Sequence, residues 1–321
     1  MQQHTAPRTQ YLLVALLFAV SVFAWCAVHR AQSTSAHSHD KPHIVCTTGM
    51  IADAARAIGG SHIHVTCLMG PGIDPHLYRA CEGDVHRLAS ADCVLYNGLH
   101  LEGKMAHMLA AMNRYVPTVA VTDTMPRERL QAPPDFPDSH DPHVWLDVTL
   151  WLYAVQRIGD QLSIIDPKHA DYYTQNMHHY CEQLRAIDTY IRTRVRSLPK
   201  HRRILVTAHD AFGYFGTAYG FRVVGLQGIS TESEAGTRDM HALVDFLVTN
   251  KIPAMFVESS VPQRAIEAVQ HAARARGWDV AIGPELFSDA LGNPDSPEAT
   301  YLGMVKHNID AIVDALKQCK L

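Results

Sequence analysis

The chain has 321 residues, of which 19% are charged, and its formal net charge at pH 7 is −4. This balance gives no basic patch that would call for nucleic acid, and no strong field that would attract acidic substrates. Seven cysteines are an odd number and do not form a ladder of paired disulfides. About 280 residues follow the N-terminal segment, which is enough for two domains of ordinary size.

The N-terminal segment has the features of an export signal. His4 and Arg8 precede an apolar run from Tyr11 to about Val28, and a polar stretch rich in Ser, Thr, Ala and His follows. The run is near the upper length for a signal core and near the lower length for a membrane span. We therefore expect residues 1–41 to be a signal or anchor segment with a flexible leader. The globular part would lie outside the cytoplasmic membrane, in the periplasm or its equivalent.

Three fates of this segment remain open. Cys26 favours lipidation, but Phe23, Ala24 and Trp25 before it match poorly with the small-residue box of lipoproteins. Retention as an uncleaved anchor is a second alternative, and removal after the small residues near Ala36 is a third. Each of them leaves the globular part on the same side of the membrane.

Residues 42–165 alternate between short runs typical of strands and apolar stretches of helical period. Four strands are predicted, at His43–Thr48, His62–Leu68, Cys93–Tyr96 and Thr118–Val121. Helices are predicted at Met50–Ile58, Gly83–Ala89 and, after a loop around Pro133–Pro142, Val148–Ile164. This alternation indicates βα units with a parallel sheet in a first lobe.

A long uninterrupted helix is predicted over residues 166–198. Asp166 and Pro167 provide an N-cap followed by a first-turn proline, and no Gly or Pro then appears until Pro199. A helix of about 30 residues rises about 45 Å, which is long enough to run along two small domains. An ordinary bundle helix is the alternative interpretation.

Residues 199–321 repeat the βα pattern. Strands are predicted at Arg203–Thr207, Arg222–Gly225, Ala254–Val257 and Asp279–Ile282, and helices at Thr237–Thr249, Gln263–Arg276 and Thr300–Lys317. The predicted fold class is therefore α/β, with two lobes that each hold a mostly parallel sheet flanked by helices. The long helix would join them.

Four short segments, far apart in sequence, each place one potential metal ligand near a junction between a strand and a loop. The ligands are His76 in MGPGIDPHLY, His143 in SHDPHVWLD, His209 in VTAHDAFGYF and Asp289 in PELFSDALG. A first-row divalent cation takes about four nitrogen or oxygen donors, and three imidazoles with one carboxylate meet that need. Only a folded chain can bring these four together.

The residues that flank each ligand strengthen this prediction, since the chain has 21 histidines and one alone says little. His76 and His143 both follow Asp-Pro, and a residue before proline is restricted to extended backbone. His209 follows the apolar run Ile204–Thr207 of a predicted buried strand, and Asp289 lies in a polar loop. Loops at strand ends are where α/β sheets bind ligands.

Eight segments resemble the metal-binding solute-binding proteins of bacterial ABC transporters. In order between about Ile44 and Val313 they are MGPGIDPHLY, ADCVLYNGLHLE, DPHVWLDV, VTAHDAFGYFGTAYGF, GLQGIS, FVESSVP, ELFSDALG and TYLGMVKHNID. The resemblance thus covers nearly the whole chain after the leader, and several segments are long enough to be specific.

The resemblance implies a zinc site, with manganese possible, in a cleft between the lobes. It assigns the ligands to His76 and His143 from the first lobe and to His209 and Asp289 from the second. Manganese-restricted members of the family carry Glu at the third position, where this chain has His209. The resemblance further implies a monomer that passes its metal to an ABC permease in the cytoplasmic membrane, with the long helix as a rigid connection between the lobes.

An exported zinc-dependent hydrolase is the alternative function. A hydrolase keeps an open coordination position for water and a general base nearby, whereas four protein ligands fill a tetrahedral shell. The sequence also lacks a His-Glu-x-x-His motif, a nucleophile elbow around a serine and a recognisable Cys-His pair. Binding of one metal ion without turnover of esters, peptides or phosphoesters would separate the two functions.

Two further groups of residues bear on the site and the fold. Cys46, Cys67 and Cys93 fall on the first three predicted strands, where we favour small buried apolar residues over a disulfide. No cysteine has the close spacing of a thiolate zinc site, and the redox state of these three and of Cys81 stays open. Glu258 ends a predicted strand near the cleft and is a candidate to orient a ligand histidine.

Overall fold

The computed structural model describes residues 41–132 and 139–318. Contacts group the chain from Lys41 onward into one compact unit. The expected export segment lies, apart from Lys41, outside the described residues. Within the described ranges, no helix combines the length and the apolar character needed to cross a membrane.

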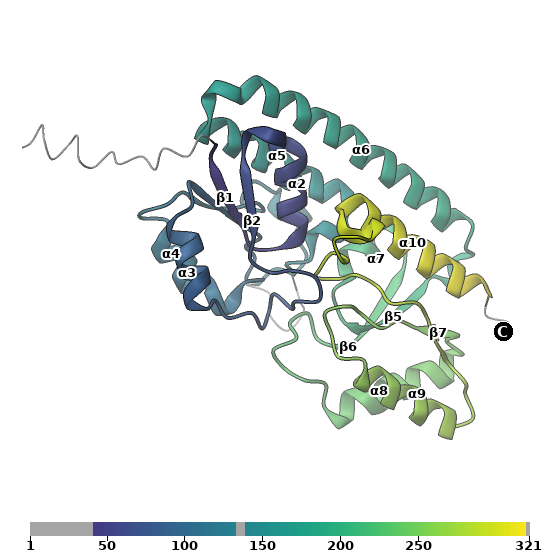
Figure 1. Ribbon diagram of the computed structural model, residues 1–321. Coiled ribbons are helices and arrows are strands. Elements are labelled where there is room, and N and C mark those ends of the chain that lie inside the picture. Colours follow the sequence, from purple (N-terminus) through teal and green to yellow (C-terminus); the bar gives the residue numbers. More distant parts are fainter. Residues whose placement is uncertain (1–40, 133–138, 319–321) are drawn as a thin grey trace, which may run out of the picture. The chain divides into compact units, whose positions relative to one another are not determined.

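The first half of the described chain holds a four-stranded parallel sheet (Figure 1). Its strands are β1 (His43–Cys46), β2 (His64–Cys67), β3 (Cys93–Tyr96) and β4 (Thr118–Ala120), in the order β2-β1-β3-β4. Parallel neighbours need crossover connections, which the intervening helices supply. The predicted parallel βα arrangement is confirmed, and each strand ends within two residues of its expected bounds.

Both faces of this sheet are covered by helices, as its nearly continuous apolar strands require. The helices are α2 (Gly49–Gly59), α3 (Glu82–Ala89), α4 (Ala106–Met112) and α5 (Val148–Ile165). Successive strand residues point to opposite faces, so Ile44 and Cys46 pack in the core beneath α2 and α5, while Val45 packs in the core beneath α3 and α4. Helix α4 is not among the predicted elements, because its seven residues are too few to show a helical period.

The long helix begins with a 3₁₀ turn, Pro167–His169, and continues as α6 (Ala170–Arg196). Its 27 α-helical residues rise about 40 Å. The prediction of one helix over 166–198 is corrected at its first turn. There the carboxylate of Asp166 accepts hydrogen bonds from Nδ1 of His169, at 2.6 Å, and from the hydroxyl of Tyr173, at 2.7 Å, and not from a backbone N–H.

Helix α6 packs against elements of both halves of the chain. In Figure 1 it lies along α2 and α5 at one end and along α10 (Tyr301–Gln318) at the other, and these contacts are extensive. Helix α6 therefore packs along both halves of the chain, and its role as a rigid connection between two lobes stays a prediction.

The second half holds two pairs of parallel strands: β5 (Ile204–His209) with β6 (Arg222–Gln227), and β7 (Ala254–Met255) with β8 (Ala281–Ile282). The backbone N–H of Phe256 donates to the carbonyl of Val206 at 2.8 Å and so connects the two pairs. Strands β7 and β8 are two residues long where four were predicted. Strand β7 stops early because the ladder breaks and resumes only as an isolated bridge between Glu258 and Leu286, and β8 begins two residues later than predicted. Helices α8 (Thr237–Asn250) and α9 (Arg264–Ala275) pack with these strands.

A short helix that was not predicted, α7 (Gly213–Tyr219), follows β5 directly. Its glycines resemble helix breakers in the sequence. In the structure one of them allows close packing and another adopts a left-handed backbone conformation. A Cβ at Gly216 would stand 2.8 Å from the side chain of Val223 and 2.9 Å from the carbonyl of Phe221. Gly220 ends the helix with φ +76°, a left-handed conformation that favours glycine.

One hydrophobic core runs through both halves. It includes Leu95 and Trp151 from the first half and Phe212 and Tyr301 from the second, and the rings of Trp151 and Tyr301 stack with centroids 5.5 Å apart. The division into lobes at residues 42–165 and 199–321 therefore stays a prediction.

The cysteines of the described residues are free thiols: Cys46, Cys67, Cys81, Cys93 and Cys181. Cys46 and Cys93 are fully buried, and burial raises the pKa of the Cys93 thiol to about 12. The favoured interpretation, small buried apolar residues, is confirmed for these two.

Candidate metal centre

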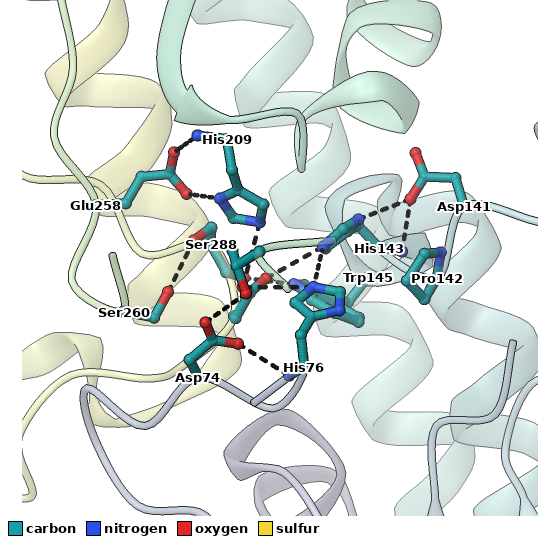
Figure 2. A network of polar contacts seen from close by, with 12 residues as sticks. Asp74, His76, Asp141, Pro142, His143, Trp145, His209, Glu258, Ser260 and Ser288 are labelled. Carbon is teal, nitrogen blue, oxygen red and sulfur yellow. Dashed lines mark hydrogen bonds and ion pairs between the residues drawn. The ribbon is translucent and has the colours of Figure 1, made fainter. Parts of the chain in front are cut away.

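The four predicted ligands come from four separate segments. His76 lies in the loop after β2, and His143 stands directly before a 3₁₀ turn, Val144–Leu146, that leads into α5. His209 is the last residue of β5, and Asp289 lies in the loop between β8 and α10. Figure 2 shows the rings of His76, His143 and His209 directed toward one another.

The structure brings these four side chains together in the interior. One ligand atom from each lies within 4.8 Å of all the others, and all four residues are buried. Nε2 of His143 lies 3.2 Å from Nε2 of His76 and 3.3 Å from Oδ1 of Asp289. Oδ2 of Asp289 lies 3.2 Å from Nε2 of His209 and 3.9 Å from Nε2 of His76.

These separations suit a small cation. Four tetrahedral donors at about 2.1 Å from a zinc ion stand about 3.4 Å from one another, close to the distances between the donor atoms here. Nε2 of His209 and both carboxylate oxygens of Asp289 are buried without a hydrogen-bond partner. Buried polar atoms without partners are costly, and a bound cation would give a partner to the imidazole of His209 and to the carboxylate of Asp289 at once.

The two Asp-Pro-His motifs hold their histidines in the same way. In each motif the aspartate carboxylate accepts the backbone N–H of the histidine two residues later, Asp74 from His76 at 2.8 Å and Asp141 from His143 at 2.9 Å. This is an Asx turn, and the proline inside it has a restricted φ. The repeated motif therefore builds two stiff corners, each with an imidazole at its end.

Two buried carboxylates orient the rings of His143 and His209 (Figure 2). Oδ1 of Asp141 accepts Nδ1–H of His143 at 2.7 Å. Oε1 of Glu258 accepts the backbone N–H of His209 at 2.9 Å, and Oε2 lies 2.6 Å from Nδ1 of the same ring. A carboxylate on Nδ1 leaves Nε2 as the metal-binding nitrogen and makes it a better ligand. Glu258 thus lies where it was predicted, whereas Asp141 was missed although the repeated Asp-Pro-His motif was a usable signal.

Trp145 connects the segments that carry His143 and Asp289. Its indole N–H donates to the carbonyl of Ser288 at 2.7 Å, and its own carbonyl accepts the hydroxyl of Tyr301 at 2.7 Å. The indole therefore links the residue beside Asp289 to the turn that follows His143. Nothing in the sequence pattern pointed to this contact.

Comparisons with known proteins decide the family. The family model described as "Zinc-uptake complex component A periplasmic" matches residues 44–315. The chain belongs to this family. It is 46% identical over 308 residues to the manganese-binding lipoprotein MntA of Bacillus subtilis, which covers 96% of this chain and 99% of MntA. It is 49% identical over 289 residues to the zinc-binding protein TroA of Treponema pallidum, covering 90% of this chain and 93% of TroA.

The solved structure of periplasmic zinc-binding TroA from Treponema pallidum has the same fold. It superposes with a TM-score of 0.84 at 50% sequence identity, and the match covers 86% of this chain and 99% of that chain. The α/β prediction and the resemblance to metal-binding solute-binding proteins of ABC transporters are therefore confirmed. The hydrolase alternative receives no support, since the family consists of transport components.

Burial and the neighbouring carboxylates give the three imidazoles different pKa values. Burial lowers the pKa of His76 to about 3. Burial also acts to lower the pKa of His143, but the charges of Asp141 and Asp289 outweigh it and raise that pKa to about 9. The pKa of His209 is raised in the same way, against burial, by Glu258 and Asp289. Burial acts to raise the pKa of Asp289, but the charges of His209 and His143 hold it well below its usual value.

Proposed function

We propose that His76, His143, His209 and Asp289 bind one divalent transition-metal ion as cargo. The protein captures this ion outside the cytoplasmic membrane and delivers it to the permease of its ABC transporter. The observation that supports this most strongly is the convergence of four buried donor atoms within 4.8 Å of one another. The two oxygens of Asp289 add to it, since both are buried without a hydrogen-bond partner among the described residues.

Zinc is the cargo that the donor set favours. Imidazole suits zinc, whereas manganese prefers oxygen ligands, and three of the four donors are imidazoles. Similarity alone leaves the metal open, because TroA is named for zinc and MntA for manganese at nearly equal identity to this chain. Manganese binds the same centre more weakly and fills it when zinc is scarce.

The protein acts as a carrier without catalytic activity. Four protein donors fill a tetrahedral shell and leave no position for an activated water. Asp141 and Glu258, the nearest further carboxylates on the histidine rings, are engaged by Nδ1 atoms. We further propose that the protein works as a monomer of two lobes, held near the permease by its N-terminal segment.

Metal analysis of protein purified without added metal or chelator tests this function. We expect about one zinc ion per chain, and no turnover of esters, peptides or phosphoesters. Replacement of His76 or His143 by Ala should weaken zinc binding at least about tenfold, because each removes one of four donors. His271→Ala is the matched control, since His271 is exposed on α9. Full zinc binding by both ligand variants would contradict the proposal.

A further inference from the structure

The segment 228–236, which connects β6 to α8, reaches across to the first half of the chain beside the metal centre. Most of its residues are exposed, but Thr231 is buried, with 7% of its surface accessible. The hydroxyl of Thr231 donates to Oδ2 of Asp74 at 2.6 Å. A short surface segment thus has one buried residue, and that residue contacts the loop that carries His76.

Asp74 connects this contact with Thr231 to the candidate ligand His76. Its other oxygen, Oδ1, accepts the backbone N–H of His76 at 2.8 Å. One carboxylate therefore ties Thr231, from the second half, to His76, from the first. We call this the Asp74–Thr231 bridge. The hydroxyl hydrogen bond is short and its acceptor is charged, which makes it stronger than a neutral pair.

The other two histidine ligands do not depend on such a bridge. His143 and His209 each have a carboxylate on Nδ1 and on the backbone N–H. Among the interactions of the described residues, no carboxylate contacts Nδ1 of His76, and Asp74 accepts only its backbone N–H. Leu77 and Ile73 beside it are partly exposed, at 49% and 39% of their surface. Of the three histidine ligands, His76 is therefore the one whose ring no carboxylate orients through Nδ1.

A second contact joins the same two parts of the molecule. Nζ of Lys104 lies 2.9 Å from Oε1 of Glu232, the neighbour of Thr231. Both side chains are about one-third exposed or more, at 32% and 40%, so salt screens this pair and its contribution is small. The buried hydroxyl hydrogen bond is the contact that matters.

We propose that the Asp74–Thr231 bridge is a positioning contact that slows metal release by holding His76 on the ion. This inference rests on the proposed function. Release requires the His76 loop to move away from the other three donors, and the loop cannot do so while its Asp74 is bonded to the second half. Loss of the bridge should therefore raise the dissociation rate much more than it lowers the association rate.

Stopped-flow release of zinc to excess chelator tests this, with the full chain kept soluble in mild detergent. Thr231→Val removes the hydroxyl but keeps the shape, and we expect zinc dissociation about 10 to 100 times faster, the effect of one hydrogen bond to a charged group. Thr231→Ser should restore the wild-type rate. Ser230→Ala is the matched control, because the Ser230 hydroxyl only accepts the N–H of Glu232 in its own segment. It should leave the rate unchanged.

The outcomes separate this inference from the proposed function. Wild-type protein that binds zinc, with equal dissociation rates in Thr231→Val and wild type, would overturn the bridge and leave the carrier function intact. Failure of the wild type to bind zinc at one ion per chain would overturn both. If Thr231→Val does not fold, hydrogen exchange of the backbone amides of residues 229–235 in the wild type tests the bridge instead. We expect slower exchange on zinc loading, and equal exchange with and without zinc contradicts the bridge.

Discussion

A single oxygen of Asp141, Oδ1, accepts both the backbone N–H and the Nδ1–H of His143, at 2.9 and 2.7 Å. The carboxylate thus orients the ring in two ways at once, and it does so as a buried neighbour of the candidate metal centre. Glu258 does the same for His209, with one oxygen for each of the two contacts. Two of the three imidazoles are thus held with Nε2 directed at the other candidate donor atoms.

The first prediction concerns these orienting carboxylates. Asp141→Asn keeps an oxygen that can accept the backbone N–H but removes the charge that strengthens His143 as a ligand. We expect zinc affinity to fall by about 10- to 100-fold, the usual cost of losing such a partner, and Glu258→Gln should behave alike. Competition with a chelating dye measures this. Asp123→Asn is the control, because Asp123 forms an exposed ion pair with Arg157. An unchanged affinity in both test variants would refute the orienting role.

The second prediction concerns pH. A cation must displace the proton from any imidazole that it binds. In the metal-free protein the pKa of His143 is raised to about 9 and that of His209 is raised too, whereas burial lowers that of His76 to about 3. At pH 7, zinc therefore displaces protons from His143 and His209 but not from His76. We expect zinc affinity to rise from pH 6 to pH 8, with protons released on binding. Calorimetry in buffers of different ionisation enthalpy counts these protons, and an affinity indifferent to pH would be inconsistent with this account.

The same shifts predict how metal removal changes stability. A raised pKa means that protonated His143 stabilises the metal-free fold fully below about pH 6.5, its unfolded value. That contribution is lost as the pH rises through about 9, its folded value. Zinc binding strengthens over the same range, so the rise in Tm on adding zinc should be larger at pH 8 than at pH 6. Thermal unfolding with and without chelator measures both values, and an equal rise at both pH values would contradict the predicted linkage.

Part of the candidate metal centre and most of the fold could be predicted from the sequence alone. The Asp-Pro-His motifs of His76 and His143 and the strand before His209 predicted three segments whose side chains the structure brings together, because each depends on local backbone chemistry. The α/β arrangement followed from the period of the apolar residues, and strands β1 to β6 lie close to their predicted bounds. Each of these features depends on residues that are close together in the sequence.

Other features depend on residues that meet only after folding. Thr231 and Asp74 are 157 positions apart, and Trp145 and Ser288 are 143 apart. No local pattern marks such pairs. Helix α7 was missed because Gly216 resembles a helix breaker, although its true role is to let the helix approach Val223 and Phe221 closely. Strand β7 was predicted too long, since the apolar run continues while the ladder stops, and β8 was predicted to begin two residues too early.

The third prediction concerns metal choice. Three imidazoles and one carboxylate should bind zinc more tightly than manganese, as the Irving–Williams order also expects. His209→Glu adds oxygen and negative charge and should narrow this preference. Titration of the wild type and the variant with both metals measures it. Tighter binding of manganese than of zinc by the wild type would show that the donor set does not decide selectivity.

The fourth prediction concerns motion. Helix α6 packs against α2 and α5 in the first half and α10 in the second, and one continuous helix resists the backbone rotations of a flexible hinge. We expect metal release to involve loop movements such as that of the His76 segment, without a wide opening. Solution scattering should give nearly equal radii of gyration for metal-free and zinc-loaded protein. A difference of several ångströms would mean that α6 bends or breaks.

Anomalous diffraction at the zinc edge, from crystals of the zinc-loaded protein, tests the central claim most directly. The account predicts one strong peak among Nε2 of His76, His143 and His209 and the carboxylate of Asp289, about 2.0–2.2 Å from each donor. A peak elsewhere in the molecule, or one at this place with any of the four side chains turned away from the ion, would contradict it.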